Sequence, residues 1–410
     1  MSLTAAIILA AIFLSCALDI YLKHRQAASV AGHRGRVPVE FVDQVSLEEH
    51  QRAADYTLAN LRLAKVQTIF DTLIALLWLT VFLAPVYTLL AQIIAPGFTR
   101  SVAMVVSVAA IGHILNLPFS IVRTFRLEDR FGFNRTTPGM FLRDQIKAAA
   151  LQLVFGVPLL YGLLWLLHIL PNLWWLLGWA ALMVIMISMI VIYPALIAPL
   201  FNKFTPMADE TLKTRIEALL AKCGFESKGL FVMDASRRST HGNAYFTGLG
   251  RAKRIVFFDT LLQKHGPDEI LSILAHELGH YKFGHIGQRI AEGAVLSFLA
   301  FAVLHFAFAR GGLAMAFGLP DDPALVLIIV LTAMGPVSHL LSPLTSWLSR
   351  RAEFQADHFA KTMVGPEAMI SALTKLSRDN LSTLTPDRLY TLFYYSHPPV
   401  PVRIAQLKGV

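Results

Sequence analysis

Seven apolar runs, each close to the length of a membrane-spanning helix, constrain the fold of this chain more than any other feature. Crossing the hydrocarbon core of a bilayer takes roughly 20 mostly apolar residues, and a lipid-exposed backbone is stable there only in helices or closed barrels. Only 15% of the 410 residues are charged, against about a quarter in soluble proteins. The sequence therefore predicts an α-helical polytopic membrane protein. The expected spans are Leu3–Tyr21, Ile69–Ile94, Val102–Val122, Ala148–His168, Leu173–Ile197, Ala291–Phe308 and Ala324–Trp347.

The basic residues alternate between the two ends of these spans. Thirteen Lys or Arg lie between the fifth and sixth spans and eight follow the seventh, whereas the loop after the fourth has none. The positive-inside rule then places the N-terminus outside and the C-terminus in the cytoplasm. Because topology accounts for the net charge of +9, we do not expect nucleic-acid binding. Short loops and a tail without a dilysine signal favour a bacterial inner membrane over the endoplasmic reticulum.

A metal-binding pattern lies in the cytoplasmic segment before the sixth span. His276, Glu277 and His280 form the motif HExxH, in which the two imidazoles fall on one helical face at a spacing that Zn²⁺ accepts. The glutamate next to the first imidazole can reach a metal-bound water, which makes the motif a metallopeptidase signature. A helix with two surface histidines is the plainer alternative. The motif predicts a zinc peptidase with one metal ion per chain.

A zinc site of this type needs a third protein ligand. His285 is one residue out of register with the metzincin pattern, and on a continuing helix it would lie about half a turn from the other imidazoles. Glu353 is the better candidate, because Asp357 follows one turn later and could accept the second ring N–H of a ligand histidine. An exposed charged helix face is the alternative interpretation of this pair. We therefore expect a gluzincin-like site.

The motifs divide the chain into four segments. Residues 1–197 hold spans one to five, and residues 198–289 form a cytoplasmic segment with the HExxH helix. Spans six and seven occupy residues 290–347, and residues 348–410 complete the metal site from the cytoplasmic side. The sequence of the second segment also predicts a helix at Asp209–Lys222 and a small β-sheet. The expected strands are Leu230–Met233, Ala244–Phe246 and Arg254–Phe258.

Blocks outside the HExxH motif carry a resemblance to a known family. They are Phe131–Arg135, Pro199–Phe204, Asn243–Phe246, Ile255–Leu262 and Tyr395–Pro399. In this order, and with seven spans, they resemble the Ste24-type CAAX prenyl proteases of the M48 metallopeptidases over essentially the whole chain. Smaller relatives of the HtpX type share the metal motif but have fewer spans.

The resemblance implies a role for each candidate site residue. His276, His280 and Glu353 would bind Zn²⁺ and leave a fourth position for water, with Glu277 as the general base. His397 would stabilise the oxyanion, and Arg403 would bind the substrate backbone or carboxylate. The edge strand Asn243-Ala244-Tyr245-Phe246 would pair with an extended substrate. A turn at His397 and an ordinary buried strand are the plainer alternatives.

The resemblance also implies that the seven helices enclose a chamber within the membrane. Polar residues inside the predicted spans fit such a lumen because charge that faces lipid is costly. Examples are His113, Asn116, Glu292 and His305. Packing between helices would explain some of them equally well.

Three functions remain open at this point. The preferred one is a zinc endopeptidase that cleaves near the C-terminus of CAAX-type substrates, with or without an isoprenyl group. The second is an HtpX-like quality-control protease of misfolded membrane proteins. The third is a non-catalytic isoprenoid or lipid binder, against which the general base Glu277 argues. The expected partners are a peptide or protein substrate and membrane lipids, and we expect a monomer.

Overall fold

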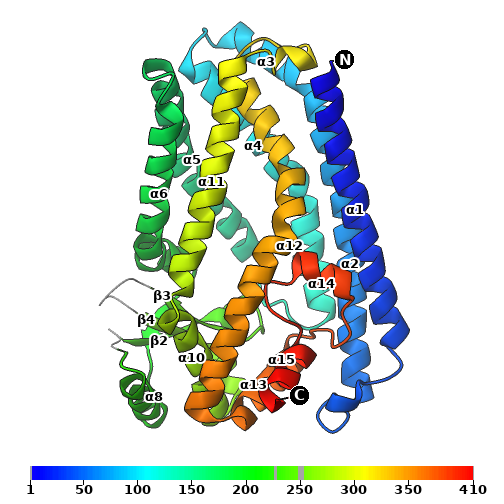
Figure 1. Cartoon of the computed structure of the whole chain (residues 1–410), viewed down its shortest axis with the longest axis vertical. Helices are drawn as coiled ribbons and strands as arrows, with labels where there is room; N and C mark the ends of the chain where they lie inside the picture. Colours follow the sequence, from blue (N-terminus) through cyan, green and yellow to red (C-terminus); the bar gives the residue numbers. More distant parts are fainter. Residues whose placement is uncertain (1, 226–228, 248–253, 410) are drawn as a thin grey trace.

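Seven long apolar helices form an elongated body, and a smaller mixed domain covers one end of it (Figure 1). The structure is a computed structural model that describes residues 2–225, 229–247 and 254–409. The N-terminus lies at the end of the helical body remote from the small domain, and the C-terminus lies beside that domain (Figure 1). Because the two termini lie at opposite ends of the helical body, the chain crosses that body an odd number of times.

All seven predicted spans are confirmed. Each lies in a helix that is long and apolar enough to cross a membrane. Helix α2 continues through a short π-helical stretch into α3, so that the two form the second span. The helices are α1 (Leu3–His33), α2 (Leu47–Leu77), α3 (Leu83–Ile93), α4 (Phe98–Val122), α5 (Pro138–Ile169), α6 (Trp174–Ile192), α11 (His285–Arg310) and α12 (Pro323–Val364).

Helix starts follow ordinary capping chemistry. Ser46 and Glu49 form a capping box at the start of α2, in which the Ser46 hydroxyl accepts the Glu49 N–H and the Glu49 carboxylate accepts the Ser46 N–H. The Thr137 hydroxyl accepts the Met140 N–H at the start of α5, and Pro138 occupies the first turn of that helix, where no N–H is needed. Both helices begin before their apolar runs, so that α2 and α5 extend beyond the predicted spans on the side of the small domain.

The small domain combines a four-stranded sheet with helices from two distant parts of the chain. The sheet order is β1-β2-β4-β3, with β2 and β4 parallel and the outer pairs antiparallel. The predicted strands are confirmed as β2 (Leu230–Met233), β3 (Ala244–Thr247) and β4 (Arg254–Phe258), while β1 (Phe204–Pro206) was not predicted. The helices of this part are α7 (Ala198–Phe201), α8 (Glu210–Lys222), α9 (Asp259–Lys264) and α10 (Pro267–Lys282). The C-terminal tail adds α13 (Pro366–Asp379), α14 (Arg388–Tyr394) and α15 (Val400–Lys408).

One continuous helix connects the membrane body to the small domain. Helix α12 has 42 residues, and its buried residues include all of Ala324–Val330 near one end and one face near the other, formed by Ala352, Glu353, Ala356, Asp357, Phe359 and Ala360. Pro336 and Pro343, which interrupt the last apolar run, lie inside this helix without ending it, as prolines in membrane helices often do. The expected division between residues 347 and 348 falls within α12. It therefore does not separate two structural elements, and the same helix continues from the membrane body into the small domain.

Helices α10 and α12 approach so closely that only glycine fits between them. A Cβ atom at Gly279 would lie 2.9 Å from Ala356 Cα and 3.2 Å from Phe359 Cβ. Both neighbours are buried, and Ala356 offers no flexible side chain that could move away. The small residue inside the HExxH motif is thus required by the packing of these two helices.

We predict that Gly279→Ala destabilises the protein by about 1–3 kcal/mol, because the added methyl group overpacks the contact between α10 and α12. Thermal unfolding of the detergent-purified protein measures this as a lower melting temperature. Gly287→Ala on α11 is the matched control, since a Cβ atom there would meet nothing within 4 Å. Equal melting temperatures for both variants and the parent would contradict the packing argument.

Candidate active site

The HExxH motif lies on a helix whose start and inner face are both well defined. Pro267 occupies the first turn of α10, and the Glu269 carboxylate accepts the N–H of Gly266 at 2.8 Å. Ile270, Leu274 and Leu278 are buried on the core side of the helix. This packing orients His276 and His280 together toward α12.

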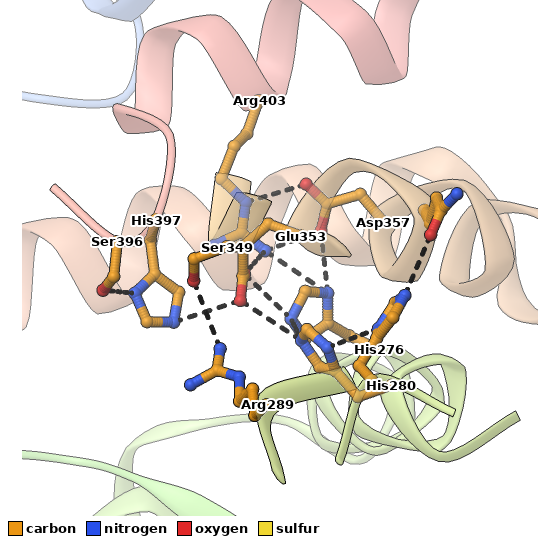
Figure 2. A network of polar contacts seen from close by, with 11 residues as sticks. His276, His280, Arg289, Ser349, Glu353, Asp357, Ser396, His397 and Arg403 are labelled. Carbon is orange, nitrogen blue, oxygen red and sulfur yellow. Dashed lines mark hydrogen bonds and ion pairs between the residues drawn. The ribbon is translucent and has the colours of Figure 1, made fainter. Parts of the chain in front are cut away.

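Three side chains from α10 and α12 meet as a candidate metal site (Figure 2). The Nε2 atoms of His276 and His280 lie 3.2 Å apart. Glu353 Oε2 lies 3.3 Å from His276 Nε2, and Glu353 Oε1 lies 3.2 Å from His280 Nε2. The three predicted ligands therefore come together although the chain brings them from separate helices.

These distances fit one tetrahedrally coordinated ion. Ligands bound at about 2.0–2.1 Å around a tetrahedral metal are separated by roughly 3.3 Å, close to the spacing of the three donors. Glu353 is 1% exposed, and its Oε2 has no hydrogen-bond partner among the described residues. A buried carboxylate oxygen without a partner is costly, and a cation between these donors would remove that cost.

The other ring nitrogen of His276 is held by a buried carboxylate. His276 Nδ1 lies 2.8 Å from Asp357 Oδ1. Arg403 binds the same carboxylate through two hydrogen bonds, from Nε at 2.8 Å and from Nη2 at 2.6 Å. Burial alone would lower the pKa of His276, but the neighbouring carboxylates of Asp357 and Glu353 outweigh it and raise the pKa to about 9. The ring is thus held with Nδ1 toward Asp357 and Nε2 toward the metal position.

His280 has an equivalent support that the sequence did not reveal. His285 Nδ1 lies 2.9 Å from His280 Nδ1, and His285 Nε2 lies 2.9 Å from Gln355 Oε1 of α12. As expected, His285 is not among the three clustered donors. Helical spacing could not locate it, because α10 ends at Lys282 and Gly284, with φ of 69°, turns the chain into α11. A glycine directly before the histidine was the only local signal of this turn.

The tail brings His397 to the opposite side of Glu353. His397 Nε2 lies 3.3 Å from Glu353 Oε1, and its side chain remains 61% exposed. Arg350, one turn before Glu353 on α12, donates to the carbonyl oxygens of Thr391 at 3.1 Å and Tyr395 at 2.8 Å. Arg350 thereby fixes the segment that carries His397, a role that no motif indicated.

Glu277 borders a cavity beside the three donors. The cavity has a volume of about 420 Å³, and its polar lining includes His276, Asn243, His397 and Arg403. The Glu277 side chain makes no hydrogen bond to any described residue, and burial raises its pKa. The carboxylate is therefore available to accept a proton from a molecule in the cavity.

The predicted edge strand lies along the same cavity. Among the described residues, strand β3 pairs with β4 on one side and has no strand on its other edge. Asn243 and Ala244 line the cavity, whereas Tyr245 and Phe246 lie further along the strand. The Asn243 side chain accepts the N–H of Ala244 at 2.8 Å, and its backbone carbonyl accepts the N–H of Phe258 at 3.0 Å.

We predict that Asp357→Asn weakens metal binding by about 10–100-fold, the usual effect of losing a carboxylate that orients a ligand histidine. Metal retained during dialysis against graded chelator, measured by elemental mass spectrometry, tests this. Glu367→Gln, a change of an exposed carboxylate on α13, should leave metal retention unchanged. Unaltered retention in Asp357→Asn would show that the His276–Asp357 contact does not support the ligand.

Comparisons with known proteins agree with this geometry. Residues 26–203 match the family model described as the N-terminal part of CAAX prenyl proteases with five membrane helices, and residues 206–410 match peptidase family M48. CAAX prenyl protease 1 homolog of Arabidopsis thaliana is 40% identical over 299 residues, which cover 72% of this chain and 70% of that protein. CAAX prenyl protease 1 of Saccharomyces cerevisiae is 31% identical over 422 residues, which cover 96% and 92%.

The fold of the whole chain is also similar to a solved structure. The crystal structure of S. mikatae Ste24p superposes with a TM-score of 0.94 at 29% identity and covers 99% of each chain. Both family models together span nearly all of the sequence, and the metal-binding cluster lies in the M48 part. The chain is an integral membrane metallopeptidase that belongs to peptidase family M48, among the Ste24-type CAAX prenyl proteases.

Proposed function

We propose that this protein is a zinc endopeptidase that cleaves near the C-terminus of CAAX-type substrates, with or without an isoprenyl group. The observation that carries the proposal is the triangle of His276 Nε2, His280 Nε2 and Glu353 carboxylate oxygens, with sides of 3.2–3.3 Å. Glu277 lies in the adjoining cavity together with an unpaired strand edge. The names of the relatives supply the substrate class.

Two imidazoles and one carboxylate favour Zn²⁺, which commonly takes three protein ligands and one open position in catalytic sites. When bound, zinc polarises the scissile carbonyl and lowers the pKa of water toward about 7. We propose His276, His280 and Glu353 as its ligands. Asp357 and His285 would hold the two imidazoles in place from their Nδ1 atoms.

Glu277 is proposed as the general base and, later, the general acid. Its carboxylate would take a proton from the attacking water and then deliver a proton to the leaving amine nitrogen. Burial raises the pKa of Glu277, which makes its carboxylate a stronger base for the first step. His397 would donate to the oxyanion that develops on the carbonyl.

Substrate binding is assigned to β3 and Arg403. An extended peptide could add to the open edge formed by Asn243, Ala244, Tyr245 and Phe246, with main-chain hydrogen bonds that hold it beside the metal. Asp357 occupies Nε and Nη2 of Arg403, so Nη1 is the nitrogen left for a substrate carbonyl or carboxylate. Arg403 would then stabilise the ligand shell and contact the substrate at the same time.

The membrane body is proposed to enclose a chamber that admits the substrate. Polar side chains of neighbouring membrane helices contact one another, which places them inside the helical body: Gln67 of α2 donates to Asn116 of α4 at 3.2 Å. Ser15 of α1 lies 3.0 Å from His339 of α12. We also propose the four-segment division, a cytoplasmic C-terminus, a bacterial inner membrane and a monomer, without a role for nucleic acid.

We predict that Glu277→Gln lowers the rate of peptide hydrolysis by about 10²–10⁴-fold, as expected when a general base is lost. Metal content should stay at the level of the parent protein, because Glu277 is not one of the three clustered donors. Cleavage of a quenched fluorescent peptide and elemental analysis give the two values. The control Glu367→Gln should retain both; substantial turnover by Glu277→Gln with metal intact would refute the proposed mechanism.

Substrate class is tested with three substrates at equal concentration in detergent. They are a farnesylated CAAX peptide, its unprenylated twin and an unfolded membrane protein. We expect one or both CAAX peptides to be cleaved at a single site near the C-terminus, and the unfolded protein to be cleaved much more slowly. Equal turnover of all three would favour a quality-control protease, and mass spectrometry of the products locates each cleavage.

A further inference from the structure

A basic cavity separate from the proposed active site lies where the membrane body meets the small domain. Its volume is about 720 Å³, and it is lined by the first turns of α5, by α7 with the residues that follow it, and by the segment after β2. The basic residues in its lining are Arg143, Lys147, Lys203, Arg237 and Arg238, and Asp144 is the acidic one. The lining therefore has an excess of four positive charges.

Several of these positive charges are not neutralised inside the protein. Arg238 is paired with Asp144, to which its Nε donates at 3.0 Å, and Arg237 is paired with Asp234 at 3.0 Å. Among the residues that the structure describes, the side chains of Arg143 and Lys203 have no hydrogen-bond or ion-pair partner. Lys147 donates only to a backbone carbonyl, that of Leu200. The cavity thus presents cationic groups to whatever fills it.

The depth of the cavity relative to the membrane follows from two helices independently. From Ile169, the far end of α5, to Lys147 the helix rises about 33 Å, slightly more than the roughly 30 Å hydrocarbon core. From Trp174, the start of α6, to Tyr193 the rise is about 29 Å. Arg143 lies one turn beyond Lys147, about 39 Å from Ile169, and α7 ends at Phe201, about 40 Å from Trp174, just before Lys203. The three basic groups therefore extend from the edge of the hydrocarbon core to about 10 Å beyond it, on the headgroup side.

The lining also includes an apolar side suited to an acyl chain. Leu200 lines the cavity and is 47% exposed, and Phe201 lies beside it with Lys147 Nζ 5.6 Å from its ring centre. A soluble anion would gain nothing from these side chains, whereas a phospholipid has a phosphate for the basic groups and a chain for the apolar ones. An acidic protein segment would have to reach into the headgroup layer.

We propose that this cavity binds the phosphate headgroup of an anionic phospholipid. The phosphate oxygens accept hydrogen bonds from Arg143 and Lys203, and Leu200 packs against the start of the acyl chain. A lipid bound here contacts α5, α7 and the segment before β3 together. It therefore contacts both the membrane body and the small domain, at a junction separate from the one that α12 makes.

The test uses the full-length protein purified in detergent and exposed to mixed phosphatidylcholine and phosphatidylglycerol. Native mass spectrometry counts the lipids that each chain retains. The parent should retain phosphatidylglycerol in preference to phosphatidylcholine, and Arg143→Gln with Lys203→Gln should lower that retention by about 30-fold, as expected for the loss of two cations near the headgroup. Both residues are exposed and unpaired, so the double variant should fold with an unchanged melting temperature.

The control is Arg62→Gln with Lys65→Gln, which removes the same charge from α2 just before its apolar run. This variant should retain as much phosphatidylglycerol as the parent. If both double variants lose the same amount of bound phosphatidylglycerol, the retention depends on the overall positive charge near the membrane and not on this cavity, and the proposal is overturned. Inorganic phosphate and glycerol phosphate are added to separate samples. If they protect the parent against heating as well as the lipid does, the cavity is a site for soluble anions and the lipid assignment is wrong.

Discussion

The close contact between α10 and α12 is the constraint on which the rest of the site depends. Charged groups are stable in a protein interior only when they are paired or bind a metal. Glu353, Asp357 and Arg403 are all buried at this contact, and the described side chains that pair with each of them lie on another element. Gly279 permits the approach, and the approach in turn places Glu353 against both imidazoles and Asp357 against His276.

The membrane body takes part in positioning the site. Helix α12 continues from the apolar core of the spans to Glu353 without a break. The proposed metal ligand Glu353 therefore lies on a helix whose other end packs among the membrane helices. The tail is fixed to α1 as well, because Arg25 binds Asp387 at 2.9 Å and Ser29 donates to the carbonyl of Thr385 at 3.1 Å. Through Arg350 and this tail, His397 is placed by contacts with both the membrane helices and α12.

Most of the architecture could be predicted because its signals are local or periodic. The apolar runs determine the spans, and the HExxH spacing places His276 and His280 on one face of a helix that begins at Pro267. Strand β1 was missed because it has only three residues, one of them a proline, and so carries almost no pattern. His285 was judged on the geometry of a continuing helix, which Gly284 interrupts. Arg350 was missed because its partners are backbone carbonyls, which leave no trace in side-chain motifs.

The sequence by itself determined the membrane class, the number of spans, the metal motif and the residue types of the chemistry, since each depends on composition or on spacing within one element. Tertiary structure decided which nitrogen of each histidine faces the metal position, and it brought His285 and Arg350 into supporting contacts. It also decided that Arg403 is bound to Asp357 while it borders the cavity. These outcomes depend on distances between elements far apart in the chain, and such distances are set only when α12 and the tail pack against α10.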